Sequence, residues 1–397
     1  MEQLAIFGGK PVLEQKVGYG HQFIDEDDIQ AVVSVLKSNY LTCGPKIDEA
    51  EKKLCEITGA KHAILVSNGT AALHAACFAA GIGERDEVIT TPITFAASAN
   101  CVLYCGGKPV FADINPQTYN IDPDQIAKCI TKKTRAVIAV DYTGQAVEIE
   151  RIKRICEENN LVFIEDAAHS LGTKYNGVPV GSLADMTEFS FHPVKTCTAG
   201  EGGAITTNND ELYKKLLLFR THGITRNASW MNGESEGGWY YQQIDLGYNY
   251  RMTDIQAALL SSQLDKLDLF ANRRKELVRR YNEAFRKIPE ITVQEEIPES
   301  DTVRHLYILQ FNLEMLDGCR RDFYEALQAE GVGVNVHYIP TYSFPYYQKL
   351  GYKKGMCPNA EKLYERIISL PLFYGLTNEQ QDKVIEAVKK VTNYYRK

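Results

Sequence analysis

The chain has 397 residues, of which 44% are hydrophobic and 24% charged, and its formal net charge is −7 at pH 7. These are ordinary globular values, and the length exceeds that of one ordinary core, so we expect a large domain of residues 1–265 and a small one of residues 266–397. The acidic balance, without a block of like charges, argues against nucleic acid or an anionic membrane as a partner.

The N-terminal sequence MEQLAIFGGKPVLEQ has neither a basic start nor a long apolar run. No stretch elsewhere approaches the about 18 apolar residues of a membrane span. We therefore expect a cytoplasmic protein. The ten cysteines lie without CxxC pairs, which favours buried, reduced thiols over disulfides or a metal site.

Short β-rich runs alternate with helical segments between residues 63 and 194. The runs are AILVS, EVITTPIT, PVFADI, AVIAVDY, LVFIEDAA and EFSFHPV, and the segments between them include TAALHAACFAAG and VEIERIKRICEENN. This alternation predicts an α/β fold with a mostly parallel sheet between helices. Ligands of such sheets bind at the carboxyl ends of the strands, so we sought site residues just after each run.

The sequence changes texture after a long helix pattern that begins near Thr253. Residues 271–397 mix helices with the strand-like runs LYILQF, VGVNVHYI and IISLPL, which predicts a smaller α+β domain. Residues 223–243 are the most loop-like segment, with glycines, asparagines and both tryptophans. We expect this segment to contact substrate or a second subunit.

Three of the predicted strands are followed by residues that could bind a ligand or take part in catalysis. Gly69 and Thr70 begin a helix after AILVS, and free backbone N–H groups at a helix start can bind phosphate. Asp166 follows LVFIE, where a buried acid needs a helix to cap or a cationic ligand atom to meet. Lys195 follows EFSFHPV. Taken singly, the three features are better explained by a capped helix at Gly69 and Thr70, a helix cap at Asp166 and a surface lysine at position 195.

Together, at one edge of one sheet, the three features match what pyridoxal 5′-phosphate (PLP) requires. A lysine forms a Schiff base with the cofactor aldehyde, an acid pairs with the pyridine nitrogen, and a helix N-terminus holds the phosphate. Neither a Walker loop nor a G-x-G-x-x-G pattern occurs in the sequence. PLP is therefore the cofactor that we expect.

The sequence resembles the fold-type I, PLP-dependent nucleotide-sugar aminotransferases of the DegT/DnrJ/EryC1/StrS family over essentially its whole length. The matching segments are LTCGP, SNGTAAL, TPITFAASAN, FIEDAAHSLG, FSFHPVK, GEGGAITTN, RTHGITR, LGYNYRMTDIQAAL, VHYIP and SLPL. Within the family, TPITFAASAN, AVDYTGQ, SFHPVK and WYYQQIDLGYNYRMTDIQ most resemble the branch that makes UDP-4-amino-4,6-dideoxy-N-acetyl-β-L-altrosamine, a step toward pseudaminic acid.

The resemblance implies roles for the matched positions that would hold the cofactor. Lys195 is the Schiff-base lysine and the base that moves a proton between substrate and cofactor. Phe95 lies on the pyridine ring, although a core aromatic is the alternative that the residue alone favours. The other implied contacts are Asp166 to the ring nitrogen, His169 to the phenolate oxygen, and Gly69, Thr70 and Ser190 to the phosphate.

The resemblance also implies contacts beyond the cofactor-binding residues of one chain. Asn249 reaches the phosphate of the other subunit's cofactor, which makes a homodimer with a shared site. His337 and Tyr338, with residues 223–243, face the sugar nucleotide, although a strand-end His-Tyr pair is more often packing. No metal is implied.

The implied reaction is a ping-pong transamination from L-glutamate to the C4 ketone of a UDP-linked 4-keto-6-deoxy-N-acetylhexosamine. The main alternative is another 4-keto or 3-keto nucleotide sugar, UDP- or dTDP-linked. A PLP-family sugar dehydratase is disfavoured because similar members replace the lysine at position 195 with histidine, and a regulator is disfavoured because no basic segment is present. This branch commonly has Pro-Ile-Thr-Thr at residues 196–199 and glutamine at Cys43, and both departures bear on the sugar rather than on the cofactor.

Overall fold

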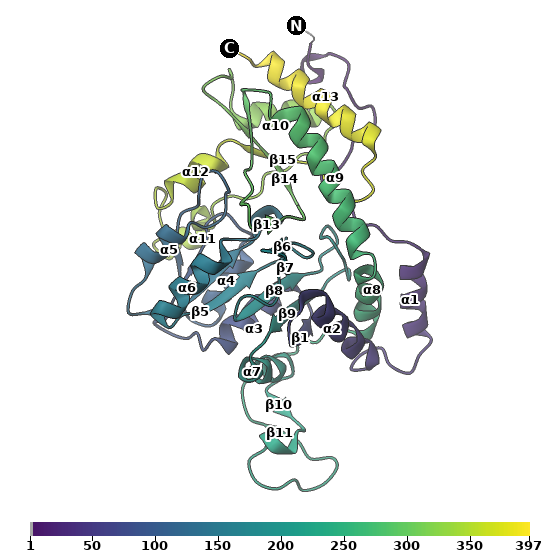
Figure 1. Cartoon of the computed structure of the whole chain (residues 1–397), viewed down its shortest axis with the longest axis vertical. Helices are drawn as coiled ribbons and strands as arrows, with labels where there is room; N and C mark the ends of the chain where they lie inside the picture. Colours follow the sequence, from purple (N-terminus) through teal and green to yellow (C-terminus); the bar gives the residue numbers. More distant parts are fainter. Residues whose placement is uncertain (1–2) are drawn as a thin grey trace.

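The computed structural model describes residues 3–397 and is built around a central sheet, which within that range has seven strands (Figure 1). Their order across the sheet is β1 (His62–Val66), β9 (Gly203–Thr207), β8 (Met186–Ser190), β5 (Val162–Asp166), β4 (Thr134–Val140), β2 (Glu87–Thr90) and β3 (Lys108–Phe111). Strands β8, β5, β4, β2 and β3 are parallel neighbours, whereas β9 runs antiparallel to both β1 and β8. The expected mostly parallel sheet is confirmed.

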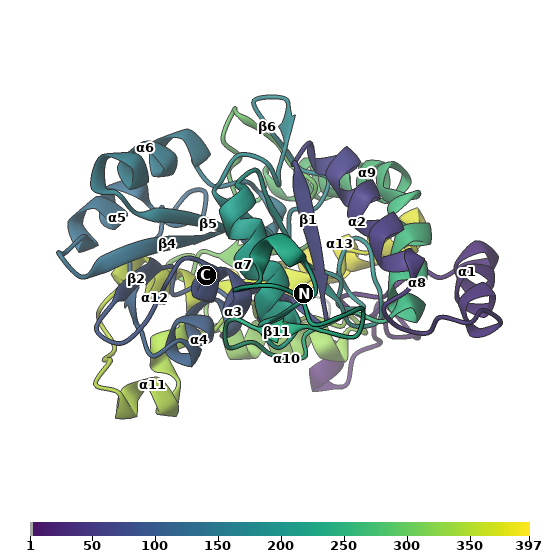
Figure 2. The same ribbon diagram turned by 90° about the horizontal axis from the view of Figure 1, so that it is seen from below.

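Helices cover both faces of this sheet, because successive strand residues point to opposite sides. On one face, Ile138 and Ile164 pack with α3 (Gly69–Ala79), α4 (Ala97–Tyr104) and α7 (Asp210–Arg220). On the other, Val137 and Phe163 pack with helices that include α2 (Pro45–Thr58), α5 (Pro123–Cys129), α6 (Ile149–Asn159) and α8 (Asp254–Leu264). Figure 2 shows α5 and α6 on one side of β4 and β5, with α3 and α4 on the other. Burial on both sides explains why the strands appear in the sequence as continuous apolar runs.

The C-terminal part forms a second apolar cluster above the sheet in Figure 1. Its elements are α9 (Leu267–Phe285), β12 (Ile291–Val293), β14 (Tyr307–Phe311), α10 (Arg320–Ala329), β15 (Ile367–Leu370) and α13 (Asn378–Tyr394), with β12-β14-β15 as an antiparallel sheet. Leu4 and Val17 from the N-terminal segment join this cluster. The expected boundary between residues 265 and 266 falls between α8 and α9 and stays a prediction.

Shorter elements complete the chain. They are η1 (Ala5–Phe7), α1 (Glu26–Leu36), η2 (Tyr142–Gly144), β6 (Lys174–Tyr175), β7 (Val178–Pro179), β13 (Ser300–Asp301), η4 (Thr341–Ser343), α11 (Pro345–Lys349) and α12 (Pro358–Tyr364). None of the helices within residues 3–397 is long and apolar enough to cross a membrane.

Two details of the C-terminal half differ from expectation. The long helix pattern does begin at Thr253, which caps α8 in a reciprocal capping box with Gln256, but it breaks into α8 and α9 after Leu264. The run VGVNVHYI is not a strand, so that expectation was wrong. Its backbone pairs at Val332 with the N-terminal segment and at Asn335 with β15, and two single bridges to different partners cannot extend into one ladder.

Residues 223–243 form an arm that projects from the body below α7 in Figure 1. The arm contains the two-stranded pair β10 (Ile224–Thr225) and β11 (Gln242–Gln243) and a short 3₁₀ turn, η3 (Ala228–Trp230). Trp239 and Tyr241 of this arm are 73% and 51% exposed. Large exposed aromatic side chains that lie close together in the chain are typical of a contact surface.

Candidate active site

A cavity of about 950 Å³ opens at the carboxyl ends of β1, β2, β4, β5 and β8. This is the edge where ligands of parallel sheets bind. Nine of the expected site residues line the cavity, namely Gly69, Thr70, Phe95, Asp166, His169, Ser190, Lys195, His337 and Tyr338. The tenth, Asn249, is not among the lining residues that the structure describes.

The first turn of α3 forms one wall of the cavity. Asn68 is its N-cap and accepts a hydrogen bond from the Ala71 N–H at 2.8 Å, which leaves the N–H groups of Gly69 and Thr70 at the cavity. A Cβ at position 69 would collide with the Glu188 carboxylate and lie 3.1 Å from the Ser190 Cβ. Glycine is therefore required for the helix start to approach the end of β8 so closely.

Asp166 ends β5 and is only 3% exposed. Its Oδ2 accepts a hydrogen bond from the Ser98 hydroxyl at 2.6 Å, and its Oδ1 accepts one from the Ala168 N–H at 3.2 Å. Two donors stabilise an ionised carboxylate at a buried position. The residues between β5 and β6 form a turn and not a helix, and Asp166 lines the cavity, so the helix-cap alternative does not hold.

Lys195 follows β8 in a turn in which its N–H donates to the His192 carbonyl at 2.9 Å. Burial lowers the pKa of its amine to about 8, and the Asp166 carboxylate limits the decrease. A lysine with such a pKa is partly neutral near neutral pH, as a proton-transferring base must be. The surface-lysine alternative therefore does not hold.

Imidazoles and a phenol form the opposite wall. The Tyr338 hydroxyl lies 3.2 Å from His169 Nε2, and the rings of His169 and His305 are 4.6 Å apart. Burial lowers the pKa of His169 and of His305 well below the usual range, and that of His337 to about 4. These imidazoles are therefore neutral at physiological pH. The buried Nδ1 atom of His169 has no hydrogen-bond partner among the described residues.

Phe95 lines the cavity and is 64% exposed, with its ring centroid 6.4 Å from that of Tyr338. This exposure excludes the core-aromatic alternative. An exposed ring at a cavity mouth is available to a planar ligand.

Asn249 lies outside the cavity of its own chain. It is exposed and forms an isolated antiparallel bridge with Thr221, close to the base of the arm. The cavity-lining residues within 3–397 also include none from residues 223–243. Tyr250, the residue after Asn249, does line the cavity, whereas Asn249 and the arm do not.

The cavity-lining residues that sequence reasoning did not single out include Tyr19, Ser98, Glu188 and His305. A signal existed for Glu188, because it alternates with Ser190 along β8 and so points to the same face. No comparable signal marks Ser98, whose role depends on its contact with Asp166. Tyr19 and His305 come from segments remote in sequence.

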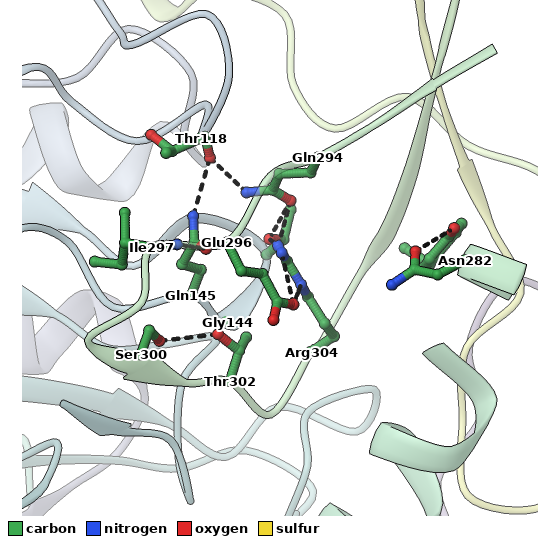
Figure 3. Close-up of polar contacts among 12 residues, drawn as sticks. Thr118, Gly144, Gln145, Asn282, Gln294, Glu296, Ile297, Ser300, Thr302 and Arg304 are labelled. Atoms are coloured by element: carbon green, nitrogen blue, oxygen red, sulfur yellow. Dashed lines mark hydrogen bonds and ion pairs between the residues drawn. The ribbon is translucent and has the colours of Figure 1, made fainter. Parts of the chain in front are cut away.

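A buried polar network holds the His305 segment against the sheet (Figure 3). The Arg304 guanidinium donates to Thr143 and Gln294, and also to Glu296 Oε1 at 3.1 and 3.0 Å. Gln294 in turn donates to the Thr118 carbonyl at 2.6 Å. The network thus joins residues 294–304 to the segments that follow β3 and β4.

Gly144 completes this junction. Its φ is +105°, and a Cβ there would lie 2.8 Å from the His169 carbonyl oxygen and 3.0 Å from the His305 nitrogen. Only glycine fits this close approach. The two facing histidines therefore depend on the geometry of the AVDYTGQ segment.

A sequence model of the DegT/DnrJ/EryC1/StrS aminotransferase family matches residues 22–389. The chain belongs to this family. Two relatives of the chain are named for different pathways. The UDP-4-amino-4,6-dideoxy-N-acetyl-β-L-altrosamine transaminase of Campylobacter jejuni is 40% identical and aligns over 96% of this chain and 99% of its own. The spore coat polysaccharide biosynthesis protein SpsC of Bacillus subtilis is also 40% identical, over 94% and 96% respectively.

Solved structures of the family have the same fold. PseC of Helicobacter pylori, an aminotransferase involved in pseudaminic acid biosynthesis, is 33% identical with a TM-score of 0.89, and the match covers 96% of this chain and all of that one. A Streptococcus pneumoniae protein assigned as a sugar aminotransferase, solved in its PLP form, is 32% identical with a TM-score of 0.89, over 96% and 99%. Both matches agree with the expected fold class.

Proposed function

We propose that the chain is a PLP-dependent transaminase that passes an amino group from L-glutamate to the C4 ketone of a UDP-linked 4-keto-6-deoxy-N-acetylhexosamine, giving UDP-4-amino-4,6-dideoxy-N-acetyl-β-L-altrosamine. The observation that carries the proposal is the meeting of Lys195, Asp166 and the α3 N-terminus in one cavity. Family membership supports the class of reaction. We expect the enzyme to act in the cytoplasm.

The cavity residues fit PLP. Gly69, Thr70 and Ser190 would hold the phosphate, and the buried Asp166 carboxylate would hold the ring nitrogen. The unpartnered Nδ1 of His169 belongs to the group that would lie near the phenolate oxygen. Bound PLP would supply an electron sink for the charge that develops when a carbon beside the amine loses its proton.

The residues of the chain would perform the remaining work. Lys195 Nζ, partly neutral because of its pKa of about 8, would accept a proton from the substrate carbon and return it. Asp166 would remain ionised through its two hydrogen-bond donors. The neutral imidazoles of His169 and His305 add no positive charge that would repel a protonated Lys195 or bind other anions.

The sugar is supported by relatives named for it. The C. jejuni transaminase is named for UDP-4-amino-4,6-dideoxy-N-acetyl-β-L-altrosamine, and the H. pylori structure is described as an aminotransferase of pseudaminic acid biosynthesis. A second candidate is a different 4-keto or 3-keto nucleotide sugar. It is favoured by the equal 40% identity to a Bacillus protein of spore coat polysaccharide biosynthesis.

We further propose a homodimer in which Asn249 and the arm of residues 223–243 complete the partner's cavity. The exposure of Asn249 and of Trp239, neither of which lines the cavity of its own chain, supports this arrangement. His337 and Tyr338 would face the sugar nucleotide from the same chain.

A substrate panel tests the proposed function. The purified protein with PLP and L-glutamate is incubated with UDP- and dTDP-linked 4-keto and 3-keto sugars, and products are identified by mass spectrometry and NMR. We expect amination at C4 of the UDP-linked N-acetylated 4-keto sugar. A preference for a dTDP-sugar without the acetamido group would refute the altrosamine assignment, and no amination of any member would refute the transaminase.

A further inference from the structure

The side chain of Glu188 occupies a buried position at the floor of the cavity. The residue is 1% exposed, lines the cavity, and has no hydrogen-bond partner among the described residues for either carboxylate oxygen. An unpaired buried carboxylate is costly, by several kcal/mol, so the group must either lose its charge or find a partner. The proposed transamination gives the Glu188 carboxyl group no role.

The neighbour of Glu188 is Asp166. The two residues are register partners on the parallel strands β5 and β8, so their side chains emerge on the same face of the sheet. The other ionisable groups around Glu188 are Lys195 in the following turn and Cys101 on α4. From α3, Gly69 faces it.

Hydrogen bonding decides which of the two acids is ionised. Asp166 accepts hydrogen bonds from Ser98 and Ala168, whereas Glu188 accepts none. Donors stabilise a carboxylate, and two adjacent carboxylates resist double ionisation, so one proton belongs to the pair and resides on Glu188. Burial and the proximity of Asp166 both raise the pKa of Glu188 well above its usual range, in agreement with this assignment.

We propose that Glu188 is a positioning residue that carries the single proton of the Asp166–Glu188 pair and donates it to Asp166, which keeps Asp166 ionised and oriented toward the cavity. The orientation matters for catalysis only if PLP binds as proposed above, and to that extent the inference rests on the proposed function. The protonation of Glu188 itself does not depend on any ligand.

The protonation is tested on the cofactor-free protein by urea unfolding between pH 5.5 and pH 8. Above its ordinary pKa, Glu188 is ionised in the unfolded chain but protonated in the folded one, so rising pH favours unfolding. Glu188→Gln removes this proton. The ratio of the unfolding equilibrium constants, parent over variant, should therefore rise about tenfold per pH unit. Glu157→Gln, an exposed position on α6, is the matched control and should give a constant ratio.

Two further measurements separate protonation from positioning. In the parent labelled with ¹³C-glutamate, an infrared C=O band of a protonated glutamic acid should be present, and Glu188→Gln should lack it. PLP affinity, followed by absorbance, should stay within about threefold in Glu188→Gln, which keeps a donor, and weaken about tenfold in Glu188→Leu, which has none.

A parent-to-Glu188→Gln ratio of unfolding equilibrium constants that does not change with pH would overturn the claim that Glu188 is protonated. An infrared band that persists in Glu188→Gln would do the same. Equal PLP affinity of Glu188→Leu and the parent would overturn the positioning. Failure to aminate any ketosugar would count against the proposed function alone, since the unfolding and infrared measurements need neither PLP nor substrate.

Discussion

At the scale of the residue, the site depends on how burial divides charge among a few neighbouring groups. Burial makes Lys195 a weaker base, while the Asp166 carboxyl group accepts hydrogen bonds from Ser98 and Ala168. The histidines of the opposite wall remain neutral. A partly neutral amine beside a fixed carboxylate is the arrangement that proton transfer at neutral pH requires.

The lysine titration can be measured directly in the cofactor-free protein. Competitive acetylation with mass spectrometry should show Lys195 gaining reactivity as pH rises, with a midpoint near its pKa of about 8. Free Nα-acetyl-lysine, added as an unperturbed reference amine, should have its midpoint at ~10.4. In Asp166→Asn the Lys195 midpoint should fall further, because the carboxylate that stabilises the ammonium is gone. A midpoint equal to that of the free amino acid would show that burial does not tune this lysine.

Replacing Asp166 separates cofactor binding from catalysis. Asp166→Asn should still bind PLP through its phosphate but slow transamination by roughly 10²- to 10⁴-fold, because an unprotonated ring is a poor electron sink. Single-turnover rates with glutamate measure the effect, and Asp268→Asn, an exposed position on α9, should be unaffected. Parental rates in Asp166→Asn would reduce the acid to a structural role.

At the scale of the element, the site is assembled from segments that meet only through buried polar contacts. The segment from Gln294 to Arg304 is joined to the ends of β3 and β4 by the network in Figure 3. His305 follows Arg304 directly and contacts His169. Breaking the network should therefore loosen one wall of the cavity.

Arg304→Leu tests this connection. The change leaves the buried Thr143 hydroxyl oxygen without its Arg304 donor and Gln294 Oε1 with the Thr143 hydroxyl as its remaining donor, so the free energy of unfolding should fall by about 3 kcal/mol. Arg279→Leu on α9 removes an exposed ion pair with Glu283 and should cost no more than about 1 kcal/mol. Urea unfolding of both variants gives the comparison, and equal losses would mean that the network contributes no more than a surface pair.

At the scale of the whole molecule, the arm projects from the body (Figure 1), and neither the arm nor Asn249 lines the cavity of its own chain. A homodimer with sites built from both chains accounts for this placement. Exposed aromatic residues on the arm would then be buried by the partner.

Mixing two inactive variants tests the shared site. Lys195→Ala lacks the amine, and Asn249→Asp places a negative charge against the partner's phosphate, so each should be inactive alone. A mixed dimer has one site with both residues intact and one with both changed. Random reassortment makes half of the dimers mixed, so refolding the two proteins together should restore about a quarter of parental activity.

The co-refolding experiment needs a control that shows that mixed dimers have formed. Chains with different tags, detected by mass spectrometry, provide this control. Recovery near a quarter supports the shared site. No recovery in the presence of mixed dimers would place Asn249 in the site of its own chain or outside any site.

The sequence alone determined the central sheet and the positions of Asp166 and Lys195. Strands buried on both faces leave continuous apolar runs, and polar residues that end such runs stand out against them. The helix start at Thr253 was equally visible, because a capping box is local. The run VGVNVHYI misled because apolar alternation also suits a segment that bridges two partners once each.

Only the tertiary structure decided how the site residues are supported. Ser98, Glu188 and His305 acquire their importance from contacts across strands and between distant segments, and no local pattern encodes such contacts. The same holds for Arg304, which sequence reasoning would place on a surface, as an unpaired arginine is costly to bury. Long-range packing brings Arg304 to its partners. The same packing buries Lys195, and this burial lowers the pKa of its amine.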